Sequence, residues 1–254
     1  CEQNVDVDLP YQERIVVNGF VSSSWSTPST PTIHITRTLP PLATADTARL
    51  RIADLMATMT HQGVDYPLMV EADGMRVRIP VEAEQWTGDT VMLNVRGAGM
   101  LARAVTYIPV RPVITASSVS DSTTEWGAEI KRISLTVRSE AGSCIVVSIG
   151  RDIPMEYDFP MSTWQRPGLV AGTRRDSMTE MTMTIPYWGS LVSGESIPVA
   201  VYATDGAFAR YRASYTAGGG PFSSGGSNPW FNVQGDGIGM FVGASVVTDT
   251  IRIP

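Results

Sequence analysis

Hydrophobic and polar residues alternate over many short segments of this chain, and this alternation constrains the fold more than any other feature. Across residues 130–137, isoleucine, leucine and valine alternate with arginine, serine and threonine, and across 178–185 methionine and isoleucine alternate with threonine. A period of two puts successive side chains on opposite faces of a β-strand. Such segments recur at intervals of roughly ten residues with turn signals between them, which predicts an all-β fold of sandwich type.

Two prolines and a polar stretch near the middle of the sequence predict two β-sandwich-like halves. Pro109 and Pro112 punctuate the chain, and Ser and Thr dominate the segment that follows. We therefore expect an acidic tether at 1–12, an N-terminal sandwich domain at 13–112 and a C-terminal β domain at 113–254. The first half is expected to be immunoglobulin- or transthyretin-like, and the second to be another sandwich or a partly open barrel. Whether the halves share a sheet edge stays open.

Four segments need an interpretation of their own. Residues 52–60 carry apolar side chains at helical spacing, so a short helix competes with a strand there. Residues 197–202 and 207–215 read as a strand pair joined by the turn dipeptide Asp205-Gly206. Residues 154–175 hold three prolines and are expected to be irregular. The glycines of 235–239 lack a following helical period, so they predict turns and close backbone approach rather than a phosphate loop.

Composition excludes some classes of function. The 254-residue chain is 43% hydrophobic and 17% charged and has a formal net charge of −6. Because binding to phosphates needs concentrated lysine and arginine, nucleic acid is not an expected partner. No apolar run approaches the roughly 18–20 residues that a membrane-spanning helix needs.

A search for catalytic residues yields no constellation. The two histidines, His34 and His61, are expected to be solvated, and Cys144 is expected to be a buried hydrophobe on a strand. Neither a metal site nor a cofactor is expected. Glu156 and Asp158 lie beside aromatic residues and leave a glycan-binding or glycan-hydrolysing reading as the least favoured alternative.

Six tryptophans lie mostly at loops or strand ends, where large amphipathic rings serve either as interface anchors or as caps of a sandwich core. Trp126, Trp164 and Trp230 are the candidate residues for binding a partner or ligand. Twelve methionines fit either core filler or an adaptable interface.

The sequence as given begins with cysteine, which is typical of a bacterial lipoprotein after removal of its signal peptide. A thioether-linked diacylglycerol and an N-linked acyl chain such as palmitate would be carried by Cys1. Since two chains already anchor a protein stably, three are expected to hold this one on a lipid bilayer.

Several motifs together resemble a family of Bacteroidota outer-membrane lipoproteins whose domain has no assigned function. They are Cys1 with its acidic tether, the segments Arg14–Val21 and Ile33–Pro40, the strand-like segments 88–95 and 102–109, and Phe231–Phe241. The last segment is similar to the family's glycine-rich C-terminal signature, from which this chain departs at Asp236 and Val242. The resemblance spans most of the chain except residues 154–194.

The resemblance implies a role and a location. Members are typically encoded beside TonB-dependent receptors, so it implies a non-enzymatic accessory subunit of an outer-membrane β-barrel, anchored in the outer membrane and facing the cell surface. The barrel would belong to an uptake receptor or to an envelope assembly or secretion machine. Glu2 and Asp6 are candidate surface-export signals, and the family brings no catalytic residues. A fimbrial or adhesive subunit that assembles by strand donation is the structural alternative.

Overall fold

The computed structural model describes residues 11–22, 32–40, 43–44, 46–123, 125–127, 129–140, 143–149, 170–173, 179–187, 193–217 and 230–253. The strands are β1 (Ile15–Ser22), β2 (Thr32–Arg37), β3 (Met56–His61), β4 (Val64–Pro67), β5 (Met69–Val70), β6 (Arg76–Arg78), β7 (Asp89–Gly97), β8 (Met100–Ile108), β9 (Val113–Thr123), β10 (Glu129–Ser139), β11 (Cys144–Ile149), β12 (Val170–Thr173), β13 (Thr179–Tyr187), β14 (Ser196–Thr204), β15 (Val233–Gly235) and β16 (Gly237–Arg252). The helices are α1 (Thr47–Leu50), the 3₁₀-helix η1 (Val81–Gln85) and α2 (Gly206–Ala217).

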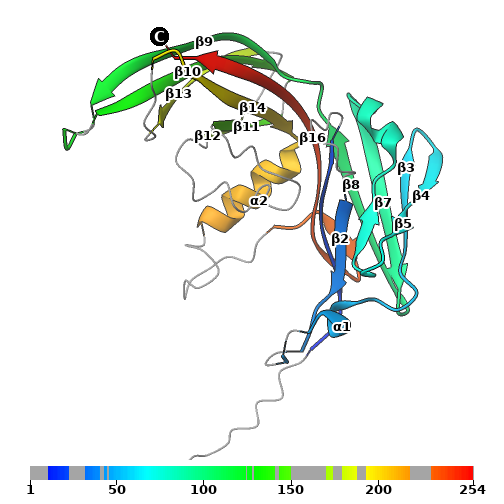
Figure 1. Ribbon diagram of the computed structural model, residues 1–254. Coiled ribbons are helices and arrows are strands. Elements are labelled where there is room, and N and C mark those ends of the chain that lie inside the picture. The colour runs from blue at the N-terminus through cyan, green and yellow to red at the C-terminus, as the bar shows by residue number, and fades with distance from the viewer. Residues whose placement is uncertain are drawn as a thin grey trace, which may run out of the picture.

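The described strands form three sheets (Figure 1). Sheet A has the order β12-β11-β14-β16-β1-β2-β6-β5, sheet B the order β15-β8-β7-β3-β4, and sheet C the order β13-β10-β9. Sheet A runs through the whole molecule, with sheet B covering one part of it and sheet C the other. The predicted all-β fold with two sandwich-like halves is confirmed.

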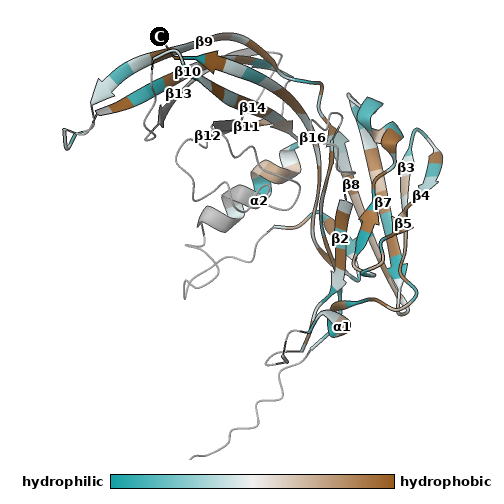
Figure 2. Ribbon diagram, in the orientation of Figure 1, coloured by the Kyte–Doolittle hydropathy of each residue, from teal (hydrophilic) through white to brown (hydrophobic). Residues whose placement is uncertain are grey.

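The first sandwich buries alternate residues of sheet A against sheet B. Ile15, Val17 and Val21 of β1 point into this core, where they join a cluster that includes Val91 and Leu93 of β7. Figure 2 shows hydrophobic and hydrophilic segments alternating along the strands of sheet B. The period-two pattern of the sequence therefore places one side of each strand in the core and the other side outside.

The second sandwich is formed by sheet C over the other part of sheet A. Ile133, Leu135 and Val137 of β10 are buried against residues of β11, β14 and the end of β16. These are the alternating residues from which the sequence predicts a strand. Cys144 is also buried on a strand, as predicted, although it points to the opposite face of sheet A.

Helix α2 covers that opposite face of sheet A. Phe208 packs with Cys144 and Val146 of β11 and with Met240 and Val242 of β16. In Figure 1 the helix lies in the hollow that the curved sheet A encloses, with sheets B and C on the outer side. The central strands of sheet A are thus buried on both faces.

Strand β16 belongs to both sandwiches because it changes its partner along its length. Its first residues pair in parallel with β1 as far as Ala244, and from Ala244 onward it pairs antiparallel with β14. A Cβ atom at Gly243 would overlap the carbonyl oxygen of Tyr107 on β8, so the glycine allows sheet B to approach sheet A closely at this point. A Cβ atom at Gly239, where φ is +114°, would likewise overlap the carbonyl oxygen of Val17, which confirms the predicted close approach in 235–239.

Two sequence-based interpretations of local structure are wrong. Residues 207–215 belong to helix α2 rather than to a strand, because Asp205 accepts a hydrogen bond from the backbone N–H of Phe208 (3.2 Å) and so caps a helix instead of opening a hairpin. The helical alternative for 52–60 is also wrong, since β3 pairs there with both β4 and β7. The first part of 154–175 lies outside the described residues, and its last part contains β12.

The predicted domain boundary between residues 112 and 113 stays a prediction. Segments that follow it in sequence return to the first sandwich, since β15 pairs with β8 and β16 pairs with β1. The polar stretch that follows the prolines is the strand β9, which pairs with β10.

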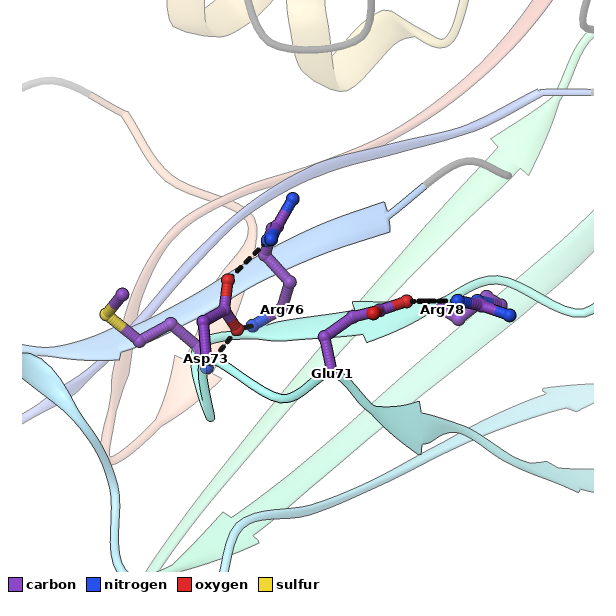
Figure 3. A network of polar contacts seen from close by, with 5 residues as sticks. Glu71, Asp73, Arg76 and Arg78 are labelled. Carbon is purple, nitrogen blue, oxygen red and sulfur yellow. Dashed lines mark hydrogen bonds and ion pairs between the residues drawn. The ribbon is translucent and has the colours of Figure 1, made fainter. Parts of the chain in front are cut away.

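Charged side chains occupy the edge of sheet A at the β5–β6 turn (Figure 3). Arg78 donates two hydrogen bonds to Glu71 (3.0 and 2.7 Å), and Arg76 pairs with Asp73. Asp73 also accepts from the backbone N–H groups of Met75 (2.9 Å) and Arg76 (3.1 Å). Burial raises the pKa of Asp73, but these hydrogen bonds outweigh it and leave the pKa below its ordinary value. The charges and the two-residue length of β5 discourage pairing at this edge.

None of the helices in the described ranges has the length and apolar character needed to span a bilayer.

Replacing Gly243 tests the close approach of the two sheets. We expect Gly243→Ala to lower the free energy of unfolding by about 3 kcal/mol or more, because the new methyl group meets rigid backbone. The matched control is Gly63→Ala, at a turn position with φ +80° and no atom within 4 Å of the added Cβ. Backbone strain alone acts there and should cost about 1 kcal/mol. Urea denaturation measures both values, and equal losses would contradict the packing explanation.

Candidate functional site

The structure places two of the three candidate tryptophans, on different elements. Trp126 lies in the turn between β9 and β10 with 82% of its surface exposed. Trp230 packs with the cluster under α2, where its backbone N–H donates to Ser214 Oγ (2.8 Å) and the Arg210 guanidinium lies 5.6 Å from its ring centre. Trp126 therefore presents an exposed ring, whereas Trp230 secures the helix. Cys1, Glu2, Asp6 and Trp164 lie outside the described residues, as do Glu156 and Asp158.

The expectation that both histidines are solvated is wrong. His61 is buried: its ring stacks on Trp86 with centres 4.4 Å apart, and its Nε2 lies 3.0 Å from Asp89 Oδ2. Gln62 donates to the same carboxylate oxygen (2.9 Å). His34 is half-buried on β2, and burial, followed by the nearby Arg76, lowers its pKa against an opposing effect of Asp73. The sequence offered no signal for the stacking of His61, because Trp86 is 25 positions away.

A buried carboxylate connects the two sandwiches. Asp205, which follows β14, accepts hydrogen bonds from Thr106 Oγ1 of β8 and from the N terminus of α2. Thr106 Oγ1 in turn accepts from the backbone N–H of Gly243 (2.5 Å), and the N–H of Asp205 donates to the Gly243 carbonyl oxygen (3.1 Å). We call Thr106, Asp205 and Gly243 the junction. Burial raises the pKa of Asp205, and its hydrogen bonds oppose that rise only in part.

Glu140 adds a second polar contact beside the junction. It accepts from the Tyr107 hydroxyl (2.5 Å) and from the backbone N–H of Val110 (2.9 Å). Burial, followed by the hydrogen bond to Glu140, raises the pKa of Tyr107 to about 12. The end of β8 and the segment between β8 and β9 are therefore held against the residue that follows β10.

The outer face of sheet B exposes several large apolar side chains, whereas the solvent face of an antiparallel sheet is usually polar. Met56 and Leu101 are 55% and 58% exposed, and Val105 is 46% exposed. Strand pairing arranges the face in three rows, which are Met56–Arg96–Leu101, Thr58–Asn94–Arg103 and Thr60–Met92–Val105. We call these nine residues the sheet B face. The face contains methionine and arginine but no lysine or glutamate, which is the residue usage of protein interfaces.

A groove of about 750 Å³ follows the end of this face nearest the β7–β8 turn. Met56, Asn94, Arg96 and Leu101 line it, together with the carboxylates of Asp54 and Asp65 on the β3 side. Asp54 has a φ of +53° and Ala98 one of +51°, so both turns that border the groove use left-handed backbone.

A second, smaller cavity of about 160 Å³ lies on the other side of sheet A, beside α2. Its lining is almost wholly apolar and includes Phe20, Phe208, Tyr211, Phe231 and Met240. Among the residues that the structure describes, no three histidine, cysteine, aspartate or glutamate side chains lie close enough together to hold a metal ion.

Comparisons with known proteins add little. No protein-family model matches the chain, and no curated protein matches it. Among solved structures, the chain is similar to one titled "Cytokine receptor complex - Crystal form 1A", with 13% identity over 93% of this chain and 95% of that chain. The TM-score of that match is 0.26.

The buried carboxylate of the junction predicts an unusual dependence of stability on pH. An aspartate whose pKa is raised above its ordinary value of 3.8 binds more protons in the folded state than in the unfolded state. The free energy of unfolding should therefore fall as pH rises from about 4 through the raised pKa of Asp205. Asp205→Asn keeps the shape of the side chain but cannot titrate. The free energy of unfolding of this variant should therefore not show the decline with pH that Asp205 causes in the wild-type chain. Urea denaturation between pH 4 and 7 measures both curves, and parallel curves would contradict the assignment.

Proposed function

We propose that the protein is a non-enzymatic docking subunit of an outer-membrane β-barrel complex and that the sheet B face is its binding surface. The observation that carries the proposal is the exposure of Met56, Leu101 and Val105 on one regular sheet face. Large apolar side chains gathered on one exposed surface mark sites of protein interaction.

The identity of the partner rests on the sequence resemblance. That resemblance implies an accessory lipoprotein beside a barrel, anchored in the outer membrane through an acylated Cys1. In this proposal the anchor holds the folded body near the barrel, and a tethered surface needs little affinity of its own to stay bound. The barrel would serve uptake or envelope assembly and secretion. Trp126 is a second proposed anchor because its ring is exposed at a turn.

One structural feature favours the fimbrial alternative. Strand β9 has 11 residues and lies at an edge of sheet C as far as the described residues go. Within β9, the one charged residue, Asp121, is paired with Lys131. A long edge with so little charge can accept a further strand.

Capture from native outer membrane in mild detergent, with a C-terminal tag, tests the docking proposal. We expect a barrel protein to co-purify stoichiometrically with the wild-type chain. Leu101→Asp should reduce that capture at least about tenfold, because it places an unpaired charge in the interface. The control is Val81→Asp, which changes a side chain that is 72% exposed on η1, away from the sheet B face.

Three other results would contradict the proposal. If the wild-type chain is purified from the membrane without any other protein, the claim of a barrel partner is wrong. Ladders of polymers on a gel would favour the fimbrial alternative. If the Leu101→Asp and Val81→Asp variants capture the barrel equally well, the protein does bind a barrel, but the sheet B face is not part of the interface.

A further inference from the structure

Two arginines lie on the sheet B face. Arg96 lies between Met56 and Leu101 in one row, and Arg103 is paired with Asn94 in the next. The two arginines are diagonal neighbours on adjacent strands, roughly 7–8 Å apart. Met56 and Leu101 flank Arg96 in its own row, and the row beyond Arg103 holds Met92 and Val105.

Neither arginine has a carboxylate partner in the part of the chain that the structure describes. The ion pairs of that part engage Arg37, Arg76, Arg78 and Lys131. Both Arg96 and Arg103 are exposed, so water solvates their guanidinium groups in the isolated chain.

Covering this face would remove water from both guanidinium groups. A charge that is buried without a partner is strongly destabilising, so an interface over the sheet B face must supply acceptors to Arg96, between Met56 and Leu101, and to Arg103 in the next row. Carboxylates match the planar fork of guanidinium through two parallel hydrogen bonds. The charge pattern therefore restricts which surfaces can bind.

We infer that the partner presents two carboxylates, one to Arg96 and one to Arg103, within an apolar surface that packs on Met56 and Leu101. This inference rests on the proposed docking function and specifies its partner. The occupant is an acidic segment of the barrel protein. Asn94 and Thr58 lie in the same rows and offer hydrogen bonds to its backbone or polar side chains.

The groove beside the face favours a protein over an anionic lipid surface. Asp54 and Asp65 line the same groove as Arg96. A layer of lipid phosphates would meet these carboxylates as well as the arginines, and like charges would then face each other. A protein surface can match the acidic and the basic positions separately.

Photo-crosslinking in native membranes tests the inference. A benzophenone amino acid replaces Leu101 in the full chain, and a second version carries it at Arg132, an exposed arginine on β10 of sheet C. We expect the Leu101 position to crosslink to one barrel peptide that contains aspartate or glutamate, and the Arg132 position not to do so. Arg96→Gln and Arg103→Gln should each weaken capture of that barrel about tenfold or more, whereas Arg132→Gln should leave it unchanged.

Charge exchange then completes the test. Arg96→Glu should abolish capture, and replacing the crosslinked acidic residue of the barrel with arginine should restore it. Capture of the barrel without any effect of the two arginine variants would overturn the inference and leave the docking function in place. Absence of a barrel from the wild-type sample would instead overturn the docking function. Flotation of the unacylated Cys1→Ser chain with lipopolysaccharide vesicles, lost when Arg96→Gln and Arg103→Gln are added to it, would overturn the assignment to a protein partner.

Discussion

The structure depends most on the contact between Gly243 and β8 at the point where β16 passes from one sandwich to the other. Without a side chain at Gly243, the backbone of Tyr107 can lie directly against β16. Thr106 and Asp205 then complete the junction, since Thr106 accepts from Gly243 and donates to Asp205. Asp205 also starts α2, whose Phe208 covers the inner face of sheet A. One small set of residues therefore fixes sheet B, sheet A and the helix relative to one another.

The sequence predicted the strands whose two faces differ clearly. In β10, isoleucine, leucine and valine face a core while arginine and threonine face outward, so period two is unambiguous. The sequence-based prediction failed at α2, where alanine and tyrosine at alternate positions give the period-two pattern of a strand. The deciding information there is the capping bond from Asp205 to the N–H of Phe208, together with a sheet face that needs cover. The cap is local, since it joins residues three positions apart, but the sheet face that needs cover is formed by residues distant in sequence, such as Cys144 and Met240.

The candidate binding surface was the hardest part to predict. The segment containing Met56 fits helical spacing, and methionine is common as core filler, so its exposure could not be foreseen. Leu101 and Val105 gave a usable signal: they alternate with the small buried residues Ala102 and Ala104, so both faces of β8 carry apolar side chains. In a two-layer sandwich only one face of each strand lies in the core. When both faces of a strand are apolar, the second face is therefore either exposed or covered by a partner. Trp126 was selected correctly as a ring at a loop, although whether it binds anything stays a prediction.

The proposed docking role requires that the junction hold the two sandwiches at a fixed relative position. The most direct test of this account is the distance distribution between spin labels at Thr90→Cys on β7 and Ser118→Cys on β9, measured by double electron–electron resonance in a chain that also carries Cys1→Ser. Cys144 is buried and should remain unlabelled. The account predicts one narrow distance in this chain and a broad distribution once Asp205→Ala is added. A broad distribution without Asp205→Ala would contradict it, because the two sandwiches would then move independently of the junction.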